Sequence, residues 1–169
     1  MKAMSLAHIE QCDTYYTIYT DGSCYNEQTT SSMYSTEYTA VYHLPNKTDI
    51  TTAELLAIQK AVEYSKDKMK AFQNIANLTD SLICVKLMGK YNTFTPDEGV
   101  CTWMNTVQEC HARGNHITII WIPSHVGIPG NEAADSLAKQ AHYIQNETYV
   151  KIPSSSGLMW LVLHRFYIV

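Results

Sequence analysis

The spacing of hydrophobic positions in the first seventy residues predicts strands followed by a helix. The run YYTIYT is β-branched and aromatic, and it leads into Asp21-Gly22, which we interpret as a turn. Two more strand-like runs follow and end at Pro45-Asn46, and apolar residues then recur at helical spacing at positions 55, 58, 62 and 69. The predicted elements are strands at 15–20, about 31–36 and 37–44, and a helix at 51–69.

The second half of the chain alternates strands with helices. The strand expected at 71–80 is interrupted by Asn77, a buried amide that costs on the order of 1–3 kcal/mol if it lacks partners. The nearly all-apolar run HITIIWIP predicts a strand covered on both faces. Asn131 is the candidate N-cap of the last amphipathic helix. The predicted elements are a short helix from about Ser81, a helix at 97–114, a strand at 116–123 and a helix at 131–145.

This order of elements predicts an α/β fold. Three strands followed by alternating helices and strands are typical of an antiparallel meander that continues into parallel strands joined by crossover helices. We therefore expect one mixed five-stranded sheet flanked by helices, in a single domain over residues 11–150. Residues 1–10 are expected to be an N-terminal flank, and residues 151–169 an apolar tail whose twelve-residue hydrophobic end is too short to span a bilayer.

Composition places the chain among soluble globular proteins. Its 169 residues are 46% hydrophobic and carry a net charge of −4, which argues against strong nucleic-acid binding by bulk charge alone. Six of its twelve basic residues lie between positions 60 and 90, so one face could still be locally positive. Five cysteines without a CxxC pair indicate free thiols in a reducing compartment. With no evident signal peptide, we expect an intracellular protein of the cytoplasm or nucleus that does not enter a membrane.

Four acidic residues stand at the ends of the predicted elements. Each has a structural explanation: an Asp-Gly turn, a capping box at Thr51–Glu54, or an acid in the first turns of a helix. Together, at the edge of the sheet where ligands gather, they would repel one another unless a cation lay between them. Oxygen ligands suit Mg²⁺ or Mn²⁺, and two such ions about 4 Å apart would serve phosphodiester hydrolysis. The four acids are Asp21, Glu54, Asp80 and Asp135.

The stretch IPSHVGIPGNEAAD places a histidine on a loop shaped by two prolines and two glycines. His125 lies ten positions before Asp135, so the loop and the following helix belong to one local unit. A histidine near its unperturbed pKa suits proton transfer at neutral pH. The alternative interpretation is an ordinary strand-to-helix connection with a surface histidine.

Four segments of the chain carry a family resemblance. TDGS (20–23), TAELLAI (52–58), LTDS (78–81) and WIPSHVGIPGNEAADSLAK (121–139) resemble the type 1 ribonuclease H family. They are most similar to the ribonuclease H domains of non-LTR retrotransposon polyproteins, over about residues 15–145. The last segment is highly specific, whereas TDGS or TDS alone would be weak evidence.

The resemblance implies a ribonuclease H-like fold and a two-metal-ion endonuclease. Its substrate would be the RNA strand of RNA·DNA hybrids, cleaved to 5′-phosphate and 3′-hydroxyl ends with two Mg²⁺ ions, for which Mn²⁺ can substitute. It implies metal binding by the four carboxylates, Asp21, Glu54, Asp80 and Asp135, and a proton-shuttling or product-release role for His125. The matching segments also supply the expected substrate-binding residues Gly22, Ser23, Ser81 and Asn131. Such a domain would act as a monomer, with an adjoining reverse transcriptase domain as a further partner.

Two other hypotheses remain open at this point. Residues 24–38 contain no glycine, and Ile50 and Thr51 stand where many cellular members carry an Asn-Gln pair. There is also little room between Asp80 and His125 for the basic protrusion of some cellular enzymes. These departures favour a degenerate retroelement-derived domain that binds nucleic acid weakly with little or no catalysis. Another metal-dependent nuclease or strand-transfer enzyme on the same fold would share the acids but would not usually carry the histidine loop.

Overall fold

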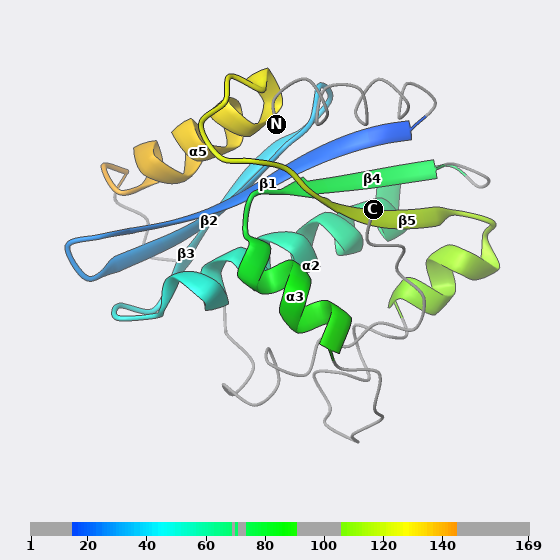
Figure 1. The fold of residues 1–169 in the computed structure, drawn as a ribbon, viewed down its shortest axis with the longest axis horizontal. Helices are drawn as coiled ribbons and strands as arrows, with labels where there is room; N and C mark the ends of the chain where they lie inside the picture. The colour runs from blue at the N-terminus through cyan, green and yellow to red at the C-terminus, as the bar shows by residue number, and fades with distance from the viewer. Residues whose placement is uncertain (1–14, 69, 71–73, 91–105, 145–169) are drawn as a thin grey trace.

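The computed structural model describes residues 15–68, 70, 74–90 and 106–144, and these residues form a five-stranded sheet with the strand order β3-β2-β1-β4-β5 (Figure 1). The strands are β1 (Tyr15–Tyr25), β2 (Gln28–Tyr34), β3 (Thr39–Leu44), β4 (Asn74–Thr79) and β5 (His116–Trp121). The helices are α2 (Ile50–Lys68), α3 (Leu82–Lys90) and α5 (Pro129–Ala141), with a further helical segment at 106–112. The flanks 1–10 and 151–169 lie outside the described residues, so the predicted domain limits stay a prediction.

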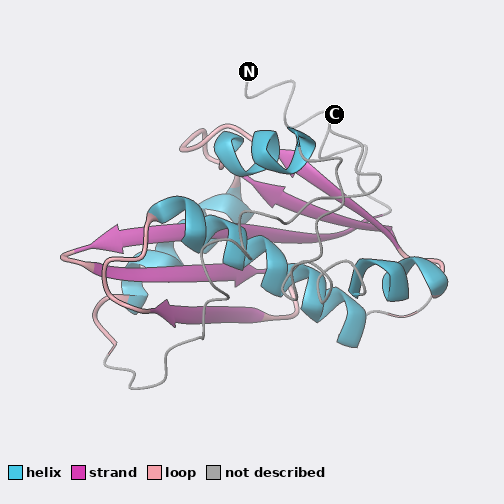
Figure 2. Ribbon diagram, turned by 90° about the horizontal axis from the view of Figure 1, so that it is seen from below, coloured by secondary structure: helices cyan, strands magenta, loops and turns pink. Residues whose placement is uncertain are grey.

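The topology confirms the predicted α/β fold. β1, β2 and β3 pair antiparallel as a meander, whereas β1 pairs with β4, and β4 with β5, in parallel. The helices and the strands form separate layers, with α2 and α3 on one side of the sheet and α5 on the other (Figures 1 and 2). Within the described residues, no helix is long and apolar enough to cross a membrane.

β4 lies inside the sheet and buries both faces. Ile75 belongs to the core cluster beneath α2, whereas Ala76 and Leu78 belong to a second cluster that includes Ile128 at the start of α5. Asn77 is buried on this strand with both sides of its amide paired. Its Oδ1 accepts a hydrogen bond from the Thr20 hydroxyl at 3.1 Å, and its Nδ2 donates to the Ile58 carbonyl at 3.4 Å. The amide that interrupts the strand pattern therefore ties β4 to β1 and α2.

The predicted turn at Asp21-Gly22 is wrong, because β1 continues to Tyr25. The chain reverses at Asn26 and Glu27, whose φ angles of 47° and 65° are those of a two-residue hairpin turn with both central residues left-handed. The pairing of β2 therefore begins at Gln28, earlier than predicted, and the next reversal falls between Tyr34 and Thr39. Asp21 thus sits in the middle of a paired strand, which fixes its backbone.

Hydroxyl side chains on β2 tie the two helix layers to the same strand. The Ser31 hydroxyl donates to the Ala53 carbonyl of α2 at 2.7 Å. On the opposite face, the Ser32 hydroxyl donates to the Ala134 carbonyl of α5 at 2.7 Å, and Thr30 donates to Ala138 further along α5 at 2.8 Å. A helix carbonyl has a second lone pair for such a bond. Small hydroxyl residues therefore hold both helices close to a strand that contains no glycine.

α5 approaches the sheet closely at Gly130. A Cβ atom added to Gly130 would lie 2.2 Å from Cε2 of the Tyr19 ring, so the helix could keep its place only if the ring moved. We expect Gly130→Ala to lower the free energy of unfolding by about 1–2 kcal/mol, because overpacking outweighs the better helix propensity of alanine. Urea denaturation of the two proteins measures the difference.

The matched control removes the ring first. In a Tyr19→Ala background the clash has no partner, so Gly130→Ala should then be neutral or slightly stabilising. An equal loss in both backgrounds would show that the glycine is needed for a reason other than its contact with Tyr19.

Candidate active site

Three carboxylates from three different elements meet at one edge of the sheet. Asp21 lies within β1, Glu54 lies near the start of α2, and Asp80 directly follows β4. One ligand oxygen from each lies within 4.8 Å of those of the other two. The parallel pairing of β1 with β4 sets Thr20 beside Thr79, so the residues that follow them reach the same edge. The structure therefore brings together three of the four predicted metal-binding carboxylates.

Gly22 allows Glu54 to reach this cluster. A Cβ atom at Gly22 would lie 3.0 Å from Cβ of Ala53 and 3.1 Å from the backbone nitrogen of Glu54. The absence of a side chain at this position lets the start of α2 rest directly on β1. The glycine after Asp21 is thus explained by a close approach of helix and strand, and not by the predicted turn.

Glu54 does not cap its own helix, so the capping box with Thr51, the structural alternative for this residue, is not formed. Asp49 caps α2 instead, accepting hydrogen bonds from the Thr52 backbone nitrogen at 2.9 Å and the Thr52 hydroxyl at 2.6 Å. Glu54 is left facing the sheet, where it is 7% exposed and its Oε2 atom is buried without a hydrogen-bond partner. An orphaned buried carboxylate oxygen is the donor expected where a cation binds.

The electrostatics of the cluster also favour a cation. Burial, and next the charge of Asp80, raise the pKa of Asp21 above its usual range. Burial, and next the charge of Asp21, raise the pKa of Glu54. A hydrogen bond from the Gly22 backbone opposes both shifts without cancelling them. A divalent cation would neutralise these charges, and the all-oxygen donor set fits Mg²⁺ or Mn²⁺.

Asn131 contacts Asp80 and does not cap α5 as predicted. The helix begins at Pro129 with Ile128 as N-cap, because proline suits the first helical position and needs no hydrogen-bond partner there. Asn131 therefore lies inside the first turn, only 2% exposed, and its Nδ2 donates to Asp80 Oδ2 at 3.1 Å. The Trp121 indole donates to the Asp80 backbone carbonyl at 3.1 Å, so Asp80 is held at both its backbone and its side chain.

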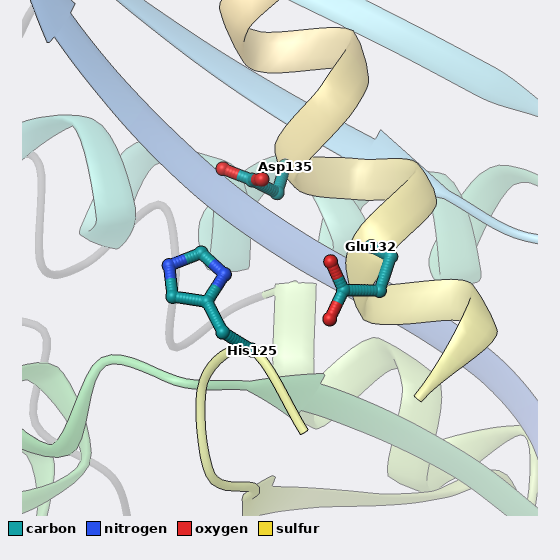
Figure 3. A group of neighbouring side chains, drawn as sticks. All are labelled: His125, Glu132 and Asp135. Atoms are coloured by element: carbon teal, nitrogen blue, oxygen red, sulfur yellow. The ribbon is translucent and has the colours of Figure 1, made fainter. Parts of the chain in front are cut away.

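Asp135, the fourth predicted carboxylate, lies beside the cluster and belongs to a second group. Its charge contributes to the raised pKa of Asp21, so the two carboxylates are neighbours. One of its oxygens, a carboxylate oxygen of Glu132 and a ring nitrogen of His125 lie within 4.8 Å of one another (Figure 3). Its Oδ2 atom is 2.8 Å from Lys139 Nζ. Glu132 and Lys139 were not identified from the sequence, although both fall in the segment that carries the family resemblance.

His125 is exposed on the loop between β5 and α5. Its φ of 51° places it in the left-handed region, and Gly127 follows with a φ of 75°. Ile122 and Ile128 are buried on either side of the loop and anchor its two ends in the core. The loop therefore presents the imidazole toward Asp135 and Glu132 from a backbone of sparsely populated geometry (Figure 3).

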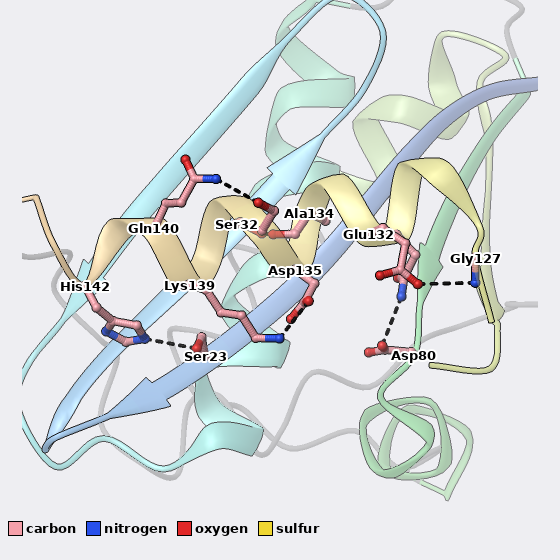
Figure 4. Close-up of polar contacts among 12 residues, drawn as sticks. Ser23, Ser32, Asp80, Gly127, Glu132, Ala134, Asp135, Lys139, Gln140 and His142 are labelled. Carbon is pink, nitrogen blue, oxygen red and sulfur yellow. Dashed lines mark hydrogen bonds and ion pairs between the residues drawn. The ribbon is translucent and has the colours of Figure 1, made fainter. Parts of the chain in front are cut away.

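The two predicted substrate-binding serines occupy different places. Ser23 lies on β1, two residues after Asp21. Its hydroxyl is 2.9 Å from Nε2 of His142, which lies just beyond the end of α5 (Figure 4). Ser81 Oγ accepts a hydrogen bond from the Cys84 backbone nitrogen at 3.5 Å and so caps α3. Ser23 is thus held near α5, whereas Ser81 has a structural role next to Asp80; contact of either residue with substrate stays a prediction.

Comparison with known protein families gives a match over most of the chain. The model of the RNase H family matches residues 13–143, which include all the elements described above. No curated protein sequence shows a significant match to the chain.

Proposed function

Because the chain belongs to the ribonuclease H family, we propose that it is an endonuclease that hydrolyses the RNA strand of RNA·DNA hybrids. The observation that carries this proposal is the cluster of the buried Asp21 and Glu54 with the half-buried Asp80. Three carboxylates forced together at the edge of a sheet are unfavourable without a bound cation, so a purely structural role does not explain them.

The cofactor proposed for this site is Mg²⁺, with two ions bound during the reaction and Mn²⁺ as a substitute. Asp21, Glu54 and Asp80 would hold it, with Asp135 as the neighbouring ligand. Bound there, such ions supply activation of the attacking water and stabilisation of the leaving oxygen, leaving 5′-phosphate and 3′-hydroxyl ends. Asn131 would keep Asp80 oriented through its 3.1 Å hydrogen bond.

His125 would move a proton at the scissile phosphate or assist product release. Its ring is exposed to an incoming substrate, and it lies beside Asp135 at the edge of the carboxylate cluster. The backbone of Gly22 and the side chains of Ser23, Ser81 and Asn131 are the proposed substrate contacts. Selection of RNA would depend on its 2′-hydroxyl groups and on the groove shape of the hybrid, so cleavage should be nearly independent of sequence.

The origin and partners of the domain belong to the same proposal. The resemblance favours a non-LTR retrotransposon polyprotein, a monomeric intracellular domain and an adjoining reverse transcriptase domain. Two lysines of the basic segment at 60–90 form ion pairs with glutamates, so their positive charge is partly neutralised. Lys60 forms a 2.6 Å ion pair with Glu63, and Lys66 a 2.8 Å pair with Glu109. Part of the affinity for the hybrid would therefore come from the neighbouring domain.

The degenerate-domain alternative rested partly on the missing glycines of the second strand. In the structure, hydroxyl residues on β2 donate hydrogen bonds to carbonyls of both α2 and α5. These bonds hold the two helices, which carry Glu54 and Asp135, against the strand. The substitution of glycines by serines and threonines is therefore compatible with an assembled site, and it does not favour the alternative.

The test is a cleavage assay with a labelled RNA·DNA hybrid. We expect cutting of the RNA strand with Mg²⁺ or Mn²⁺, no cutting with chelator, and no cutting of single-stranded RNA or duplex DNA. Folding is checked beforehand by circular dichroism. A folded protein that leaves the hybrid intact in both metals would contradict the proposal and favour the degenerate domain.

A further inference from the structure

We propose that Glu132 is a positioning residue that holds the His125 loop in place for the reaction. This inference rests on the proposed function, because it assigns Glu132 a part in the same site. It concerns a residue that is not one of the four carboxylates and that acts through another side chain.

The contact between Glu132 and the loop is direct. The backbone nitrogen of Gly127 donates a hydrogen bond to Glu132 Oε1 at 3.3 Å (Figure 4). Glu132 also points toward the imidazole, since one of its oxygens lies within 4.8 Å of a ring nitrogen of His125 (Figure 3). A single carboxylate therefore faces both the backbone of the loop and its functional side chain.

The loop needs such a support because its own backbone is strained. The left-handed φ of His125 is unfavourable for a residue with a Cβ atom, so the surroundings must hold it there. Within the part of the chain that the structure describes, the bond from Gly127 to Glu132 is the one hydrogen bond between residues 124–127 and a side chain. Without it, the loop would be held only by apolar packing, at its buried ends Ile122 and Ile128 and at the partly buried Val126 between them.

Glu132 is well placed to fix the distance between His125 and the carboxylates. It lies in the first turn of α5, where its own backbone nitrogen bonds to the Ile128 carbonyl at 3.0 Å. The preceding residue, Asn131, is bonded to Asp80, and Asp135 follows on the same helix. The hydrogen bond from Gly127 to Glu132 therefore fixes the loop to α5, which carries Asp135 and which is itself bonded to Asp80 at the end of β4.

A plain structural role would also place an acid here, because a negative charge near a helix N-terminus is favourable. The two roles differ in what a glutamine does. Glutamine keeps an oxygen that can accept from Gly127 but loses the charge, whereas alanine loses both. The hydrogen-bond role therefore predicts that the two substitutions differ, and the charge role predicts that they agree.

The experiment measures kcat and KM for hybrid cleavage by the full chain in Mg²⁺. We expect Glu132→Ala to lower kcat about tenfold with little change in KM, and Glu132→Gln to restore most of that loss. In a His125→Ala background, Glu132→Ala should cause no further loss, because the positioned group is absent. Gln140→Ala on the exposed side of α5, which removes only a bond to Ser136, is the matched control and should leave kcat unchanged.

Three kinetic outcomes would overturn the inference: equal losses in the alanine and glutamine variants, a full additional loss in the His125→Ala background, or a kcat unaffected by Glu132→Ala.

A second measurement does not depend on activity. In the NMR spectrum of the metal-free protein, the Gly127 amide proton should move upfield in Glu132→Ala and stay near its original position in Glu132→Gln. If the wild-type protein does not cleave the hybrid but the spectral difference is seen, the proposed function is contradicted and the contact between Glu132 and Gly127 is retained. Absence of the difference in an active enzyme would contradict the positioning role alone.

Discussion

Asp21→Asn should abolish hybrid cleavage and, in the same protein, increase the stability of the metal-free fold. Asp21 is 5% exposed and lies against Glu54 and Asp80, with Asp135 as a further like-charged neighbour. An amide of the same shape removes the buried charge and its repulsion, but it is a poor ligand for Mg²⁺. We expect cleavage to fall by about 10³-fold or more, as for other essential active-site groups.

The stability gain follows from the same electrostatics. At pH 8 the unfolded chain ionises Asp21 freely, whereas burial and the neighbouring carboxylates oppose its ionisation in the folded protein. Removing the acid should therefore raise the free energy of unfolding by on the order of 1–3 kcal/mol in chelator. Urea denaturation at pH 8 measures this change, alongside the cleavage assay in Mg²⁺.

Asp67→Asn is the matched control for this pair of measurements. Asp67 is an exposed acid near the end of α2, far along the helix from Glu54, so its substitution should alter neither activity nor stability appreciably. Wild-type cleavage by Asp21→Asn would remove Asp21 from the metal site. If Asp21→Asn were less stable than the wild type without metal, the carboxylates would not be destabilised by burial and mutual repulsion in the folded protein.

Periodicity and local residue signals were sufficient for the fold class but not for the exact ends of the elements. The apolar runs of β4 and β5 and the helical spacing in α2 follow directly from burial, so they were visible in the sequence. The hairpin after β1 was not, because its left-handed residues are Asn26 and Glu27 rather than the glycine expected for such turns. The start of α5 was mispredicted although Pro129 marks it, since Asn131 is the stronger N-cap residue type.

Some residues of the candidate site could likewise be predicted from the sequence, and others could not. The acids at the ends of strands and helices could be found from the order of the elements, because topology alone brings such ends to one edge of a sheet. Glu132 could not be found in this way, since its role depends on the path of the loop that contains Gly127. The hydroxyl bonds from β2 to α5 join residues about a hundred positions apart, and no local pattern records them.

The stability of the metal-free protein should fall as the pH rises from about 5 to 9. Burial, and next the charges of neighbouring carboxylates, raise the pKa of Asp21 from 3.8 to about 7 and that of Glu54 from 4.5 to about 9. Above about pH 5 the unfolded chain has released most of these protons while the folded protein still holds them. The folded state binds more protons across this window, so the free energy of unfolding decreases with rising pH through pH 9, where Glu54 is about half ionised, and levels off above it.

Mg²⁺ should reverse this trend, because it binds the ionised carboxylates and displaces the protons. Its stabilising effect should therefore grow with pH, reaching about 2.7 kcal/mol where its concentration is a hundred times the dissociation constant. Thermal melts at pH 6 and pH 8.5, in chelator and in Mg²⁺, measure both effects, with Asp21→Asn as the variant in which each should be much reduced. A metal-free melting temperature that rises between these pH values would mean that the carboxylates are ionised and well compensated by the fold itself. The carboxylates would then need no cation to offset their repulsion, whatever the cleavage assay shows.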